Sequence, residues 1–213
     1  MRIAAMSAVV ASAACMSSAP ATEQAGGSGQ LATDPVVPLE CQPALRADGS
    51  VRMALAGRPS PFDSADVRVG NQTIRVCYGR PGVKDRAIYG GLVPYDTLWR
   101  TGANEPTILH VPFTAEIAGL RVPPGSYSLY TVPGAGDWTI VINRSTSQWG
   151  HESSYSPEVR AQELGRARVR TERLDQHVEL FTIRGQPAGQ GADILLEWER
   201  TRVRIPARVA PPG

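Results

Sequence analysis

The stretch from residue 78 to residue 105 brings together four cations, several aromatic rings and an asparagine that could recognise a charged ligand. Arginine binds carboxylates and phosphates through a planar, two-pronged set of donors. A tryptophan offers a flat face for a ring or a sugar, and an asparagine amide can orient a polar group. The predicted site for a small anionic or sugar-like ligand therefore comprises Arg80, Lys84, Arg86, Trp99, Arg100, Asn104 and Glu105.

The same side chains could instead hold this stretch together. Arg100 and Glu105 lie on either side of Gly102, so a turn would bring them together as a buried ion pair. Arg86 would pair with Asp85, and the aromatic rings would pack as core. A long loop over a sheet needs such anchors for its own backbone. This structural interpretation stays open beside the ligand-binding one.

A catalytic role would fall to Glu105, the best candidate for the acid or base of a hydrolase or isomerase. The stretch contains no histidine that could activate a nucleophile, and the chain lacks the P-loop, serine-hydrolase and zinc-protease motifs. His110, His151 and His177 are each isolated in the sequence. We therefore expect no metal site and no cofactor, and the main interpretation is a non-catalytic binding protein.

The residues of the 78–105 stretch must be positioned by short segments in which apolar and polar residues alternate, each bounded by turn residues. In Thr73–Tyr78 the apolar side chains share one face, whereas Cys77 lies on the other. Because no strand–helix–strand rhythm is present, the pattern predicts an all-β fold, a single antiparallel β-sandwich of roughly nine or ten strands. The expected strands are 67–69, 73–78, 107–113, 114–118, 126–132, 138–143, 166–171, 177–183, 192–200 and 202–205.

Two connections between the expected strands contain residues typical of a turn or of helix ends. Residues 134–137, Gly-Ala-Gly-Asp, predict a hairpin between two of the expected strands. One short helix is expected with Ser156 as its N-cap, Pro157 at its first position and Gly165 at its end.

The N-terminus has the pattern of an export signal. A basic start precedes the small apolar residues 3–14, and Cys15 follows Ser-Ala-Ala in a sequence that resembles a bacterial lipobox, with Ser12 where leucine is usual. We predict a signal peptide over 1–15, lipid attachment at Cys15, a flexible tether and N-terminal extension over 16–58, the β domain over 59–206 and a tail over 207–213. A soluble exported form is the alternative, and both place the protein in the periplasm or the outer envelope.

Export changes the interpretation of the remaining cysteines. Cys41 and Cys77 remain after processing, and two cysteines in an oxidising compartment can pair. We predict a disulfide between them, with two free thiols as the alternative. The three cysteines lack the close spacing of a zinc site.

Composition excludes several classes of partner. The net charge is +2, which provides no strong field for nucleic acid. No apolar run approaches the roughly 20 residues that a spanning helix needs, so membrane contact is expected only through the N-terminal lipid anchor. The oligomeric state stays open.

Several motifs together resemble an uncharacterised family of bacterial exported proteins, catalogued as domain of unknown function twenty-nine eleven. The resemblance runs from about residue 59 to residue 206 and rests on Y-G-R-P at 78–81, K-D-R at 84–86, I-Y-G-G-L-V-P-Y at 88–95, W-R-T-G-A-N-E at 99–105, P-G-S-Y-S-L-Y-T-V-P at 124–133 and Q-W-G at 148–150. The chain departs from the family at Asp85, where glycine is usual, and at Cys77, which the family does not generally carry. The resemblance implies an exported β-rich domain and no established reaction. A purely structural envelope protein therefore remains a further alternative.

Overall fold

The computed structural model of the chain describes residues 36–212. The predicted signal peptide, lipid attachment at Cys15 and the first part of the tether lie outside the described residues. Within them, no helix is long and apolar enough to cross a bilayer.

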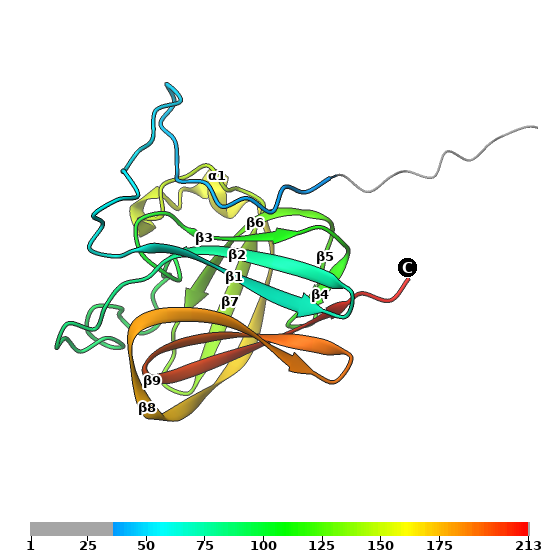
Figure 1. Cartoon of the computed structure of the whole chain (residues 1–213). Helices are drawn as coiled ribbons and strands as arrows, with labels where there is room; N and C mark the ends of the chain where they lie inside the picture. Colours follow the sequence, from blue (N-terminus) through cyan, green and yellow to red (C-terminus); the bar gives the residue numbers. More distant parts are fainter. Residues whose placement is uncertain (1–35, 213) are drawn as a thin grey trace, which may run out of the picture. The chain divides into compact units, whose positions relative to one another are not determined.

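Nine antiparallel strands form one sheet in the order β1-β2-β3-β6-β7-β8-β9-β4-β5 (Figure 1). The antiparallel all-β class is confirmed, but the strands join into a single sheet and not into the two separate sheets of the expected sandwich. Their bounds are β1 Phe62–Val69, β2 Gln72–Gly79, β3 Thr107–Val111, β4 Ala115–Ile117, β5 Leu120–Val122, β6 Gly125–Val132, β7 Asp137–Asn143, β8 Glu163–Ala188 and β9 Gly191–Val209.

The two longest strands make the sheet continuous. The first part of β8 pairs with β7, and its second part pairs with β9, with register shifts between Arg173 and Thr182. Four expected strands therefore merge into two, because the breaks in the alternating pattern are irregularities inside strands and not turns. Because β8 and β9 are long, they cross the molecule and contact β1 from the opposite side of the core (Figure 1).

The core lies between these layers and is rich in aromatic rings. The alternation in β2 is as predicted, since Ile74, Val76 and Tyr78 are buried in the core cluster. Trp99 stacks on Trp198 with ring centroids 5.7 Å apart, and Tyr89, Trp138 and Phe181 meet this pair edge to face. Tyr78, Tyr89 and Trp99 of the 78–105 stretch therefore belong to the interior, whereas Tyr95 is exposed.

The segment after β7 contains the helical turns. A 3-10 turn, η1, spans Glu152–Ser154, and the helix α1 spans Pro157–Arg160. The N-cap prediction is confirmed, because Ser156 Oγ accepts from the backbone N–H of Val159 at 3.4 Å. The predicted helix end at Gly165 is wrong: Gly165 lies in β8 opposite Ile142, since pairing with β7 takes over from residue 163.

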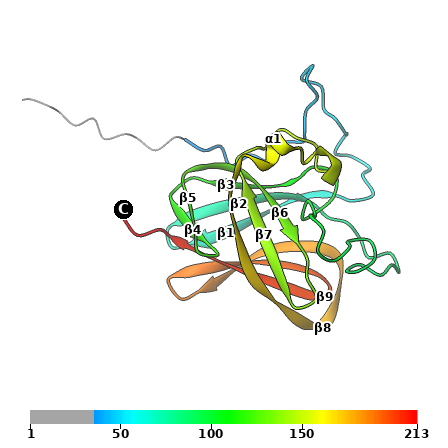
Figure 2. The ribbon, with the colours of Figure 1, turned by 180° about the vertical axis from the view of Figure 1, so that it is seen from behind.

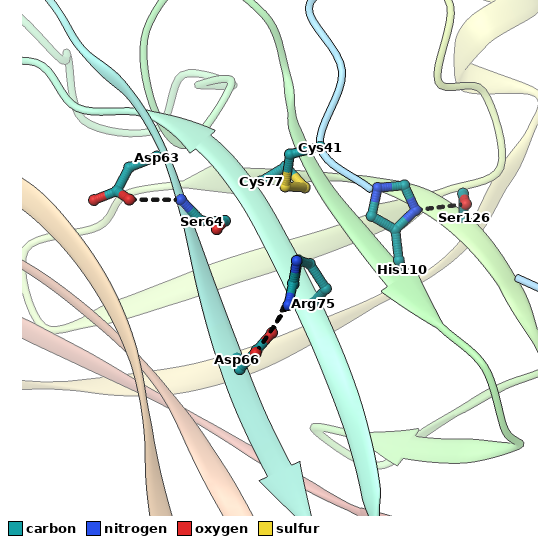
Figure 3. Close-up of a disulfide and its surroundings, with 8 residues drawn as sticks. All are labelled: Cys41, Asp63, Ser64, Asp66, Arg75, Cys77, His110 and Ser126. Carbon is teal, nitrogen blue, oxygen red and sulfur yellow. Dashed lines mark hydrogen bonds and ion pairs between the residues drawn. A yellow bond between two sulfur atoms is a disulfide. The ribbon is translucent and has the colours of Figure 1, made fainter. Parts of the chain in front are cut away.

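Residues 36–58, which we call the N-terminal segment, contain no helix or strand but are fastened to the sheet. The predicted disulfide is present: Cys41 joins Cys77 of β2, with Cα atoms 5.5 Å apart (Figure 3). Cys77 lies on the face of β2 opposite the aromatic core, as its alternation predicted, and it is covered by the N-terminal segment. An isolated bridge between Leu45 and Val51 closes a small hairpin within that segment.

Candidate functional site

Four of the six motifs lie wholly or partly in the loop that joins β2 to β3, residues 80–106, which we call the motif loop. Both ends of the loop are bound to the sheet. Near its start, the Val83 N–H donates to Glu179 O at 2.9 Å. Near its end, Trp99 and Thr131 exchange backbone hydrogen bonds of 2.7 and 2.9 Å. The middle of the loop projects from the end of the strands in both views (Figures 1 and 2).

Two glycines from separate motifs explain how the end of the loop is packed. A Cβ at Gly79 would overlap the Ala103 carbonyl, and a Cβ at Gly150 would overlap the backbone of 104–106. The loop end therefore lies between two backbones that only glycine lets come so close. Its conformation is unusual as well, because the buried and β-branched Thr101 has a φ of 57°.

The expected pair between Arg100 and Glu105 does not form. Glu105 pairs instead with Arg58 of the N-terminal segment, whose Nη1 and Nη2 donate to its two carboxylate oxygens at 2.7 and 2.8 Å. The Arg58 side chain is 1% exposed and the Glu105 side chain is 4% exposed. Arg58 also donates to the Met53 and Ala54 carbonyls. Since tertiary packing brings Arg58 to Glu105, a prediction based on sequence proximity chose the wrong partner.

Arg100 pairs with Glu152 of η1. Its Nε donates to Glu152 Oε1 at 3.2 Å and its Nη2 donates to Oε2 at 3.0 Å. The two side chains are 19% and 29% exposed, so this pair faces solvent far more than the one at Glu105. The turn around Gly102 points Arg100 and Glu105 to different sides of the loop.

The other predicted cations stabilise the loop in different ways. Arg80 donates to the Phe181 carbonyl and forms an ion pair of 3.1 Å with Asp63. Arg86 donates to the Val83 and Gly82 carbonyls, so the expected Arg86–Asp85 pair does not form within the described residues. The exposed Lys84 contacts β8 through its backbone N–H, which donates to Glu179 at 3.1 Å.

A pocket of about 470 Å³ lies between the motif loop and η1. Four of the seven predicted ligand-binding residues line it, namely Arg86, Trp99, Arg100 and Asn104. Arg80, Lys84 and Glu105 are not in its wall. The remaining wall is largely apolar and includes Leu92, Val93, Pro94, Leu98 and Trp198.

The aromatic residues divide between core and surface. Burial raises the pKa of Tyr89 far above its usual value, with the charges of Glu199 and Tyr95 adding to the shift, so its hydroxyl stays protonated. Trp138 is buried in the core, whereas Trp149 is half-buried and stacks under the Arg52 guanidinium at 5.2 Å. Trp99 and Trp198 belong to both the core and the wall of the pocket.

A serine and a histidine meet away from this pocket. His110 Nδ1 on β3 lies 2.8 Å from Ser126 Oγ on β6 (Figure 3). Burial lowers the pKa of His110, and the charge of Arg75 lowers it further. A catalytic histidine needs a group that stabilises its charged form. Since Arg75 does the opposite, we interpret the pair as a cross-strand contact.

The turn at the start of the motif loop places Lys84 and Asp85 in the left-handed region of backbone conformation. Lys84 and Asp85 have φ values of 50° and 54°, and the Arg86 N–H donates to Val83 O at 3.1 Å to close the turn. A turn with positive φ at both central positions favours glycine, asparagine or aspartate.

Replacing Asp85 by glycine is expected to raise the free energy of unfolding by about 0.5–1 kcal/mol, because glycine adopts positive φ without steric cost. Urea denaturation measures the change. The matched control is Asp85→Ala, which removes the charge but keeps a Cβ and should be no more stable than the wild type. Equal stabilisation by both variants would show that the charge and not the φ angle decides.

Sequence reasoning missed three features of the site. Glu152 lies two residues after the Q-W-G motif, so its position near a motif was the available signal. Arg58 precedes the family-like region and carried no signal. The apolar pocket residues Leu92 and Leu98 were not predicted, because the predicted site was chosen mainly from its cations. No group of three or more metal-ligating side chains is found among residues 36–212.

Comparison with family models matches residues 60–207 to the family described as "Protein of unknown function (DUF2911)". Comparisons with curated proteins and with solved structures found no match. The matched residues include the motif loop and Glu152, whereas Arg58 and Cys41 lie outside them. Since the match covers more than half of the chain and contains the motifs that first suggested it, the chain belongs to this family of unknown function.

Proposed function

We propose that this protein binds a small anionic ligand in the pocket of the motif loop. The observation that supports the proposal is that four residues from two motifs, Arg86 of K-D-R and Trp99, Arg100 and Asn104 of W-R-T-G-A-N-E, line one pocket of about 470 Å³. A concave site with an apolar wall and a few polar groups is typical of small-molecule recognition. Arg100 offers the charge, and the apolar wall around Trp99 offers a surface for the body of the ligand.

The geometry favours binding over catalysis by Glu105. A general acid or base needs a carboxyl group that reaches substrate. The carboxylate of Glu105 is buried, and Arg58 occupies both of its oxygens. The purely structural alternative accounts for Arg80 and Glu105, whose partners are internal, but it does not account for the open pocket beside Arg100.

We further propose that the protein acts outside the cytoplasm, anchored by a lipid at Cys15. The N-terminal pattern of an export signal supports this location, and the Cys41–Cys77 disulfide is compatible with an oxidising compartment. A diacylglycerol adduct on Cys15 in the membrane fraction, detected by intact mass, would support the anchor. Unmodified mature protein released into the periplasm would overturn it.

The binding proposal is tested by titrating small carboxylates, organic phosphates and monosaccharides while following tryptophan fluorescence. We expect Arg100→Ala to weaken binding by about 10- to 100-fold, the value of a lost charge-assisted hydrogen bond. Its stability should change by less than about 1 kcal/mol, because Arg100 is partly exposed. The control is Arg68→Ala, which removes an exposed arginine of β1 distant in sequence from the loop. Binding that survives Arg100→Ala would contradict the proposed site.

A further inference from the structure

The Arg100–Glu152 contact has the form of an occupied carboxylate site. Three donors converge on one carboxylate: Arg100 Nε at 3.2 Å, Arg100 Nη2 at 3.0 Å and the Arg100 backbone N–H at 3.4 Å. A guanidinium that presents two parallel donors matches the two oxygens of a planar carboxylate. The occupant in this structure is a side chain of the protein itself, at the edge of the pocket.

The two partners are held with unequal strength. Trp99 and Thr131 exchange backbone hydrogen bonds next to Arg100, and the Arg100 carbonyl accepts from the Thr107 N–H at 3.3 Å. Glu152 lies on the short turn η1, none of whose residues is buried. Its carboxylate forms hydrogen bonds only with Arg100 within the described residues. Arg100 is therefore held in place by the sheet, whereas the Glu152 carboxylate can move away from it at little cost in free energy.

The space beside this contact is suited to an apolar group. Leu92 is 47% exposed and lies in the wall of the pocket. Leu98, Trp99 and Trp198 extend the same wall from the side of the core. A ligand whose carboxylate took the place of Glu152 would lay its body against this wall.

We propose that the pocket takes a small monocarboxylate with an apolar body, and that Glu152 is a tethered competitor which the ligand displaces from Arg100. This inference rests on the proposed function and narrows it to one class of anion. The charge balance supports a ligand with a single negative charge, because such a ligand would neutralise Arg100 to the same extent as Glu152 does. An intramolecular carboxylate has a high effective concentration, so it weakens the apparent affinity for a free one.

The test uses benzoate as the probe, with the mature wild-type protein and its Glu152→Gln variant. Calorimetry measures the affinity, and the NMR shifts of the Trp99 and Trp198 indoles show whether the probe is in the pocket. We expect Glu152→Gln to bind benzoate at least about tenfold more tightly than the wild type does, since the competing charge is gone. The matched control is Asp66→Asn, which removes a carboxylate from the Arg75 pair on β1 and β2 and should leave benzoate binding unchanged.

Other outcomes separate this inference from the proposed function. Benzoate binding that Glu152→Gln leaves unchanged or weakens would overturn displacement, while the pocket would stand as a binding site. Tighter binding of phenyl phosphate or of neutral benzamide than of benzoate would overturn the carboxylate class. No benzoate binding to either protein would overturn the inference, and the proposed function would fail too if the ligand panel also gave no response that depends on Arg100.

Discussion

Glu105→Ala is expected to lower the free energy of unfolding by about 3–5 kcal/mol, because it leaves the Arg58 guanidinium buried without its counter-charge. Arg58→Ala should cost a similar amount, since it strands the Glu105 carboxylate. The pair is almost wholly buried, since the Arg58 and Glu105 side chains are 1% and 4% exposed. Urea denaturation followed by circular dichroism measures both variants.

A surface pair that also joins an arginine to a carboxylate provides the control. Arg75 Nε donates to Asp66 at 2.7 Å, but these side chains are 32% and 43% exposed. Asp66→Ala should therefore cost less than about 1 kcal/mol. Replacing both buried partners, as in Arg58→Met with Glu105→Gln, should recover much of the loss because no buried charge remains unpaired. Small effects from both single variants would contradict a structural role for the pair.

Removing the disulfide by Cys41→Ala is expected to lower the free energy of unfolding by about 3–4 kcal/mol, from the chain entropy that the crosslink removes from the unfolded state. The two cysteines are 36 residues apart, which sets the size of the closed loop. Chemical denaturation of the oxidised wild type and of the variant measures the difference.

Reducing agent gives this prediction an internal control. It should bring the wild type down to the stability of Cys41→Ala and leave the variant unchanged. Hydrogen exchange at Ala44, whose N–H donates to Glu105 at 3.3 Å, separates two possible responses. Faster exchange there without a change in global stability would mean that only the N-terminal segment is released, which contradicts the expected loss.

Local patterns predicted the features that depend on neighbouring residues. The alternation in β2 placed Cys77 on the face away from the core, and Ser156 was identified as a cap because capping involves only the next three residues. The hairpin at 134–137 also forms, with β6 and β7 paired across it. Each of these outcomes is set by backbone periodicity or by a single turn.

The features that sequence reasoning missed depend on tertiary packing. Glu105 could have paired with any of several cations, and only the path of the N-terminal segment brings Arg58 to it. The choice of Glu152 for Arg100 likewise depends on where η1 folds back over the motif loop. The length of β8 was missed because a register shift inside a strand breaks alternation in the same way as a turn does.

The contact of β1 with β8 and β9 governs the order in which the chain can fold. The first strand completes its core only against the last two, and the Tyr78 hydroxyl on β2 accepts from the Ile183 N–H at a separation of 105 residues. Topologies dominated by such distant contacts fold slowly. Until both β8 and β9 have been synthesised, the apolar faces of β1 and β2 are not fully covered and are exposed to aggregation. Truncation before β9 should therefore abolish folding of the whole domain and not merely shorten the sheet.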